Sequence, residues 1–176
     1  DTLTTIGQCA FKNCDDLTEV VIPEGVTEIG TGAFYNNNQM TKVSLPSTLK
    51  TINGEAFYLC KSLRSIDIPD SVTTIGGYAF YGCNSLKRVE IPVGVTTLSN
   101  AVFYACKGLE EVVLPEGLTT IKDGAFESCD NLVKINLPST LETLGGYVFR
   151  KSGFTSITIP AHVSSFGAEV FAQCPN

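Results

Sequence analysis

Apolar residues recur along this chain in one order that repeats about every 23 residues. Each unit reads Leu-x-x-Val-x-Ile-Pro-x-x-Val-Thr-x-Ile-Gly-x-x-Ala-Phe-x-x-Cys-x-x, with mostly polar residues between. The prolines mark the period at Pro23, Pro46, Pro69, Pro92, Pro115, Pro138 and, after one shorter step, Pro160. A fixed period of roughly 20 to 50 residues is typical of solenoids, whose units bury their apolar faces against their neighbours.

Each unit predicts a coil with three sides. The first is a short strand, because apolar residues alternate with polar ones, as at Val89 and Ile91, until proline ends it. The second is an extended bend with core residues three apart, such as Val72 and Ile75, and a following glycine that we expect at positive φ. The third, Ala-Phe-x-x-Cys, predicts one or two helical turns packed on the core. Stacked coils would form one continuous parallel sheet with strands roughly 4.8 Å apart.

The repeated unit, with proline, Ala-Phe and Cys recurring together, resembles the BspA-like (Treponema pallidum-type) leucine-rich repeat over essentially the whole chain. The fold expected is α/β: a right-handed leucine-rich-repeat solenoid with a parallel sheet on one face and short helical turns and extended bends on the others. Residues 1–176 would form a single array of about seven and a half repeats. Because the array opens and closes inside a repeat, we expect a segment of a longer protein.

Composition excludes some classes of partner. The net charge is −6 and no cluster of Lys or Arg interrupts it, so binding to nucleic acid or anionic lipid is not expected. No apolar run approaches the ~20 residues that a membrane-spanning helix requires.

Six of the seven cysteines lie in one column of the repeat, where Asn37 and Ser152 fill the two gaps. Side chains of one column point in parallel, so we expect buried free thiols and no disulfides. With no Cys-x-x-Cys pair and a single histidine, His162, we expect no metal and no cofactor. Cys9 lies outside the column and is expected to be exposed or paired outside this segment. The predicted core ladder comprises Cys14, Cys60, Cys83, Cys106, Cys129, Phe34, Phe57, Phe80, Phe103 and Phe126.

Two surfaces could bind a partner. Outward strand positions carry charges of alternating sign, which fits either a solvated face with charge pairing or a concave recognition face. The candidates on that face are Lys42, Asp67, Arg88, Glu90, Glu111 and Lys134. The position after the repeated Phe carries tyrosine in four consecutive units: Tyr35, Tyr58, Tyr81 and Tyr104. These rings could shield the coil by packing on one another, or could contact a protein or a glycan.

The resemblance implies a location on a bacterial or protist surface, a role in adhesion, and no catalytic motif. We therefore predict a non-catalytic protein- or cell-surface-binding module of a surface or secreted protein. One alternative is a structural spacer or self-assembling scaffold in a larger extracellular assembly, associating through uncapped ends or the rest of its parent chain. Another is a polysaccharide lyase-like enzyme, which would need clustered carboxylates or basic residues in a groove.

Overall fold

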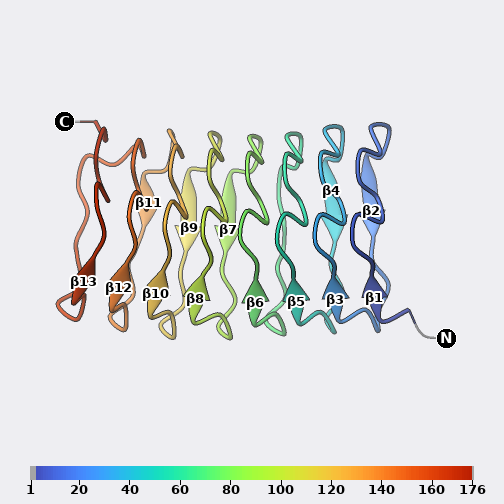
Figure 1. Cartoon of the computed structure of the whole chain (residues 1–176), viewed down its shortest axis with the longest axis horizontal. Helices are drawn as coiled ribbons and strands as arrows, with labels where there is room; N and C mark the ends of the chain where they lie inside the picture. The colour runs from blue at the N-terminus through green and yellow to red at the C-terminus, as the bar shows by residue number, and fades with distance from the viewer. Residues whose placement is uncertain (1–2, 176) are drawn as a thin grey trace.

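The computed structural model describes residues 3–175, which form a solenoid with one coil per repeat. Figure 1 shows the coils stacked side by side along the long axis, from the N-terminus to the C-terminus. Strands pair in parallel with the equivalent strand of the next coil, as Glu19 pairs with Lys42 across 23 residues. The predicted solenoid of parallel strands is confirmed.

The first side of the coil carries the predicted strands, which form a sheet in two parts. One part pairs β2 (Glu19–Val21) with β4 (Lys42–Ser44). The other part contains β7 (Arg88–Glu90), β9 (Glu111–Val113) and β11 (Lys134–Ile135), in the order β11-β9-β7. Residues 65–68 and 156–159 were expected to be strands but are not. The sequence predicted one continuous sheet along the array, and this prediction is wrong because the sheet is interrupted at these two segments.

The second side, predicted as a bend, is a parallel ladder of two-residue strands. Its eight strands are β1 (Thr5–Ile6), β3 (Glu28–Ile29), β5 (Thr51–Ile52), β6 (Thr74–Ile75), β8 (Thr97–Leu98), β10 (Thr120–Ile121), β12 (Thr143–Leu144) and β13 (Ser165–Phe166). They form two four-stranded sheets, β1-β3-β5-β6 and β8-β10-β12-β13. Strands this short cannot display an alternating pattern, so the sequence did not reveal them.

The third side consists of turns, and residues 3–175 contain no helix, so no described helix could span a membrane. Amide groups here donate alternately within the coil and to the next coil. The amide of Tyr58 donates to the carbonyl oxygen of Glu55 (3.0 Å), and the amide of Phe57 donates to that of Ala79 (2.8 Å). Glu55 (φ 58°) and Leu59 (φ 56°) lie in the left-handed region, which interrupts any helix. The expectation of helical turns is wrong on this point.

The glycine that follows the second side is needed for close packing and not for positive φ. A Cβ atom on Gly30 would lie 2.8 Å from backbone atoms of Gln8, Gly7 and Ile6 in the preceding coil. Positive φ occurs instead two residues later, as at Gly32 (φ 61°).

Between the three sides, the Phe ladder fills the core. Phe34, Phe57, Phe80, Phe103, Phe126 and Phe149 are fully buried, and successive rings stack with centroids 5.2–5.6 Å apart. Phe11, in the first described coil, is 37% exposed. Each core residue thus contacts equivalent residues of neighbouring coils, and the surface columns inherit the same regular spacing.

Candidate functional site

Tyr35, Tyr58, Tyr81 and Tyr104 form one continuous stack, which we call the tyrosine row. Successive ring centroids lie 4.6, 4.5 and 5.0 Å apart, and the rings are within 8° of parallel. Each tyrosine follows a buried phenylalanine in the turns of the third side, so the coil spacing sets the spacing of the rings. All four side chains are half-buried, with their ring faces covered by one another.

A charged side chain covers the ring at the N-terminal end of the tyrosine row. The Lys12 ammonium lies 4.6 Å from the centroid of the Tyr35 ring, within the range of a cation–π contact. In the column beyond Tyr104 comes Glu127, whose Oε1 lies 3.4 Å from Nη1 of Arg150. The row therefore offers a partner its ring edges and hydroxyl groups.

The pKa values of the Tyr58 and Tyr104 hydroxyls are raised above the ordinary value for tyrosine, and burial is the largest cause in both. For Tyr58 the neighbouring Tyr81 and Tyr35 add to the shift, and for Tyr104 the carboxylate of Glu127 does so. Both hydroxyls consequently stay neutral at physiological pH and can donate and accept hydrogen bonds.

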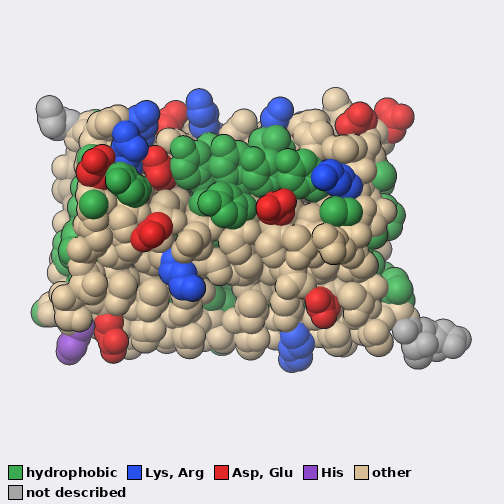
Figure 2. Space-filling view, in the orientation of Figure 1, with side chains coloured by type: hydrophobic (Ala, Val, Ile, Leu, Met, Phe, Trp, Pro, Cys, Tyr) green, Lys and Arg blue, Asp and Glu red, His purple; other side chains and the backbone are tan. Residues whose placement is uncertain are grey.

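One face of the molecule carries an apolar patch, and Tyr78 extends the tyrosine row. Figure 2 shows hydrophobic side chains gathered in one continuous patch on the upper half of the face, with Lys, Arg, Asp and Glu side chains around it. Tyr78, which is 45% exposed, lies beside the row with its ring centroid 6.2 Å from that of Tyr81. We call the row together with Tyr78 the tyrosine patch. Contiguous apolar patches on soluble proteins often mark interaction sites.

The strand face brings only some of the predicted charged residues together. Arg88 forms ion pairs with Glu90 (3.1 Å) and Glu111 (3.7 Å), all three of them substantially exposed. Lys134 pairs in register with Glu111, whereas Lys42 pairs with Glu19 in the other part of the sheet. Asp67 lies in the segment without a strand, between the two parts. Exposed ion pairs of this kind contribute little to stability.

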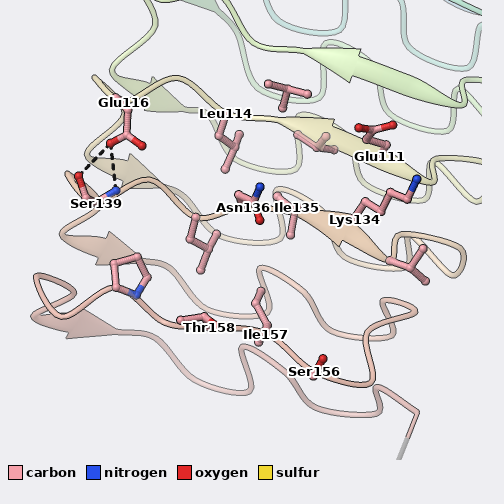
Figure 3. A pocket seen from close by; sticks show the side chains of 15 residues that line it. Glu111, Leu114, Glu116, Lys134, Ile135, Asn136, Ser139, Ser156, Ile157 and Thr158 are labelled. Carbon is pink, nitrogen blue, oxygen red and sulfur yellow. Dashed lines mark hydrogen bonds between the residues drawn. The ribbon is translucent and has the colours of Figure 1, made fainter.

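A shallow groove of about 950 Å³ crosses the strand face between three successive coils. Figure 3 shows its lining, with Glu111 and Lys134 on one side and Ser156 and Thr158 on the coil beyond. The carboxylate of Glu116 accepts hydrogen bonds from the amide (3.1 Å) and hydroxyl (2.9 Å) of Ser139. Glu116 thereby ties two coils together.

Sequence reasoning missed this contact between coils, although the sequence carries a signal for it. Glu24 makes the same pair of hydrogen bonds to Ser47, each 3.0 Å long. In both places Pro-Glu-Gly is followed one repeat later by Pro-Ser-Thr. The hydrogen bonds from Ser47 lower the pKa of Glu24 below its ordinary value, because they favour the charged carboxylate.

The structure places most of the cysteine column in the core. Cys60, Cys83, Cys106 and Cys129 are fully buried, whereas Cys14 is exposed in the first described coil, contrary to expectation, and Cys9 is exposed as well. Burial raises the pKa of Cys60 and of Cys106 to about 12. Within residues 3–175, no group of three or more His, Cys, Asp or Glu side chains is placed to hold a metal ion.

Comparison with known proteins identifies relatives of this fold. The family model described as BspA type Leucine rich repeat region, with 6 copies, matches residues 1–108 and 50–176. A leucine-rich repeat protein from Bacteroides ovatus is 33% identical, with a TM-score of 0.77, over 96% of this chain and 50% of that one. The T. pallidum leucine-rich repeat protein is 36% identical, with a TM-score of 0.80, over 84% of this chain and 69% of that one.

A leucine rich cell surface protein from Faecalibacterium prausnitzii is 28% identical, with a TM-score of 0.72, over 98% of this chain and 62% of that one. No curated protein is a significant match. The chain spans about half the length of the B. ovatus protein.

Proposed function

The chain belongs to the BspA-type leucine-rich repeat family, and on that premise we propose that it is a protein-recognition module that binds its partner through the tyrosine patch. The observation that carries the proposal is the continuous stack of Tyr35, Tyr58, Tyr81 and Tyr104, half-exposed at the surface. Tyrosine is enriched among the residues that dominate binding energy, since it combines apolar area with a hydrogen-bonding hydroxyl.

The geometry of the stack supports a low entropic cost of binding. Each ring inside the row is held between two others, so its side-chain conformation is already restricted before a partner arrives. Binding then immobilises few additional side chains, which leaves more of the interaction free energy for affinity.

The same geometry favours a protein over a glycan as the partner. A sugar that stacks on tyrosine needs a free ring face, yet the row's ring faces lie 4.5–5.0 Å from one another. At its N-terminal end Lys12 covers Tyr35. Ring edges and hydroxyls suit a polypeptide surface with apolar side chains and hydrogen-bonding groups.

A surface or extracellular location is part of the proposal. It is supported by the F. prausnitzii relative, which is described as a leucine rich cell surface protein. A lyase-like activity is disfavoured, because Ser139 engages Glu116 in the groove and Arg88 pairs with Glu90 and Glu111.

To test the proposal, this chain is used as bait to capture binding proteins from host or matrix extract, and mass spectrometry identifies them. The purified partner is then titrated against the chain to measure its affinity. The site variant carries Tyr58→Ser, Tyr81→Ser and Tyr104→Ser, and a matched variant carries Lys42→Ser, Arg88→Ser and Lys134→Ser on the strand face. Circular dichroism and thermal unfolding first establish that both variants remain folded.

Binding that the site variant loses and the strand-face variant keeps would support the tyrosine patch. The opposite result would move the site to the strand face. If neither the variants nor the parent protein captures a partner, a spacer or self-assembling scaffold becomes the better account, and analytical ultracentrifugation would then measure self-association.

A further inference from the structure

At one step between coils, the backbone ladders of two sides are interrupted together. The step lies between the coils formed by residues 63–85 and 86–108, and we call it the joint. On the second side the two four-stranded sheets end here, because β6 does not pair with β8. On the first side residues 65–68 form no strand, so β4 and β7 belong to separate parts of the sheet.

The second side shows what replaces the ladder. At the steps before and after the joint, the amide of Gly76 donates to the carbonyl oxygen of Ile52 (2.8 Å), and that of Lys122 donates to Leu98 (3.0 Å). Ser99 occupies the equivalent position at the joint, and among the described residues its amide makes no such bond. Instead its hydroxyl donates to the carbonyl oxygen of Ile75 at 2.6 Å. A side chain has taken the acceptor that the backbone uses elsewhere.

On the first side a cavity separates the two coils at the joint, and two like charges explain why the strands do not pair there. A cavity of about 450 Å³ lies between residues 65–70 and residues 88–92. Asp67 and Glu90 occupy the same outward column in these two coils, so a closed ladder would set two carboxylates opposite each other. Like charges at directly opposed positions destabilise strand pairing.

The third side is intact at the joint. The amides of Tyr78, Phe80 and Gly82 donate to carbonyl oxygens of the next coil at 3.0, 2.9 and 2.8 Å. The rings of Phe80 and Phe103 stack across the joint 5.2 Å apart, as elsewhere in the core. The two coils are therefore tied by backbone hydrogen bonds along one side only.

We propose that the joint is a hinge: residues 3–85 and 86–175 form two rigid blocks that swing about the third side and open the strand face. Two other steps also lack strand pairing on the first side, one between β4 and residues 65–68 and one at residues 156–159. At these steps the second side stays closed, because β5 pairs with β6 and β12 pairs with β13. The joint differs because two sides open at once. This inference does not depend on the tyrosine patch, since the Tyr81–Tyr104 contact lies on the closed side.

Amide hydrogen exchange of the whole chain, followed by NMR, tests the hinge with controls inside the molecule. The amide of Ile68 is the equivalent of those of Ile22 and Ile91, which donate to the next coil, but within residues 3–175 it makes no such bond. The amides of Ser99 and Ile68 should exchange roughly tenfold faster, or more, than those of Gly76 and Lys122. The amides of Phe80 and Gly82, across the same joint, should stay protected. Equal protection at Ser99, Gly76 and Lys122 would overturn the hinge.

A variant carrying Ser99→Gly and Glu90→Gln removes the hydroxyl that occupies the carbonyl oxygen of Ile75 and the charge that would face Asp67. It should slow exchange at Ile68 and at residue 99 by about tenfold, because the ladder can then close. The matched variant Asn53→Gly with Glu19→Gln alters the position equivalent to Ser99 and a carboxylate in the neighbouring outward column, both at steps that are already closed, and should slow exchange nowhere. No slowing in the first variant would overturn the account of the joint, and if it fails to fold, the wild-type exchange pattern decides.

Discussion

The thiol of Cys60 donates a hydrogen bond to the carbonyl oxygen of Phe34 in the preceding coil, with a sulfur–oxygen distance of 3.2 Å. Cys83 makes the same contact with Phe57 at 3.3 Å. Where the column holds serine, the hydroxyl of Ser152 donates a hydrogen bond to the carbonyl oxygen of Phe126 at 3.1 Å. The buried positions of the column therefore hold a small side chain that donates a hydrogen bond to the preceding coil.

This contact predicts which cysteines react. Native protein treated with iodoacetamide at pH 8 should be alkylated at the exposed Cys9 and Cys14, while Cys60, Cys83, Cys106 and Cys129 remain unmodified. Burial raises the pKa of those four thiols, and the thiolate is the reactive form. Peptide mass spectrometry measures the sites, and unfolded protein, in which all the cysteines should react, is the control. Alkylation of Cys83 at the rate of Cys9 would contradict the structure.

Stability should fall in alkali for the same reason. Burial raises the pKa of Cys106 to about 12 in the folded state, whereas an unfolded thiol titrates near 8.5. Below the unfolded pKa both states hold the proton, and the stabilisation is complete. Between about pH 9 and 12 the unfolded state holds fewer protons, so each buried thiol lowers the free energy of unfolding by on the order of 1 kcal/mol per pH unit. Urea unfolding measured at several pH values should show this slope.

Cys106→Ser should make that slope shallower, and Cys14→Ser, at an exposed position, should leave it unchanged. Ser152 shows that a hydroxyl can occupy this column, so the folded state should tolerate the change. An identical slope in the parent protein and the Cys106→Ser variant would disprove the assignment to this thiol.

The features that the sequence predicted correctly are those that recur along the array. The strand before proline, outside residues 65–68 and 156–159, the Phe ladder and the parallel register each follow from columns read at one period, as Glu19 and Lys42 illustrate. A repeated signal is averaged over seven units, so one atypical residue does not obscure it.

The features that it missed depend on contacts between coils. Apolar spacing in Ala-Phe-x-x-Cys fits a helix, but the amides of Glu55 and Leu59 donate to the next coil and hold both residues at positive φ. Nothing in the identity of Glu or Leu signals that conformation. The joint is similar, because its cause is a pair of residues such as Asp67 and Glu90 at one step of the array.

Loss of a core phenylalanine should cost more in the middle of the array than at its first described coil. Phe80 is fully buried between Phe57 and Phe103, whereas Phe11 is 37% exposed and stacks on Phe34. Phe80→Ala should therefore lower the free energy of unfolding by about 3–5 kcal/mol, and Phe11→Ala by less. Chemical denaturation measures both. Equal losses would argue against stability built from contacts between neighbouring coils.

Arg150 and Lys87 allow a comparison of two ion pairs in different surroundings. Arg150 lies 3.4 Å from Glu127, whose side chain is only 14% exposed. Lys87 lies 2.6 Å from Glu110, but both of those side chains are more than half exposed. Arg150→Ala should destabilise the protein by about 1–3 kcal/mol, because it leaves a mostly buried carboxylate without its partner. Lys87→Ala should change stability by at most about 1 kcal/mol.

A second substitution separates lost charge pairing from lost packing of the Arg150 side chain. Adding Glu127→Gln to Arg150→Ala removes the unpaired charge, so this double variant should be more stable than Arg150→Ala alone. Thermal and urea unfolding of the parent protein, Arg150→Ala and the double variant supply the comparison. If Glu127→Gln recovers nothing, the contact of the Arg150 guanidinium with the Tyr147 ring, 5.5 Å from its centroid, would instead account for the loss.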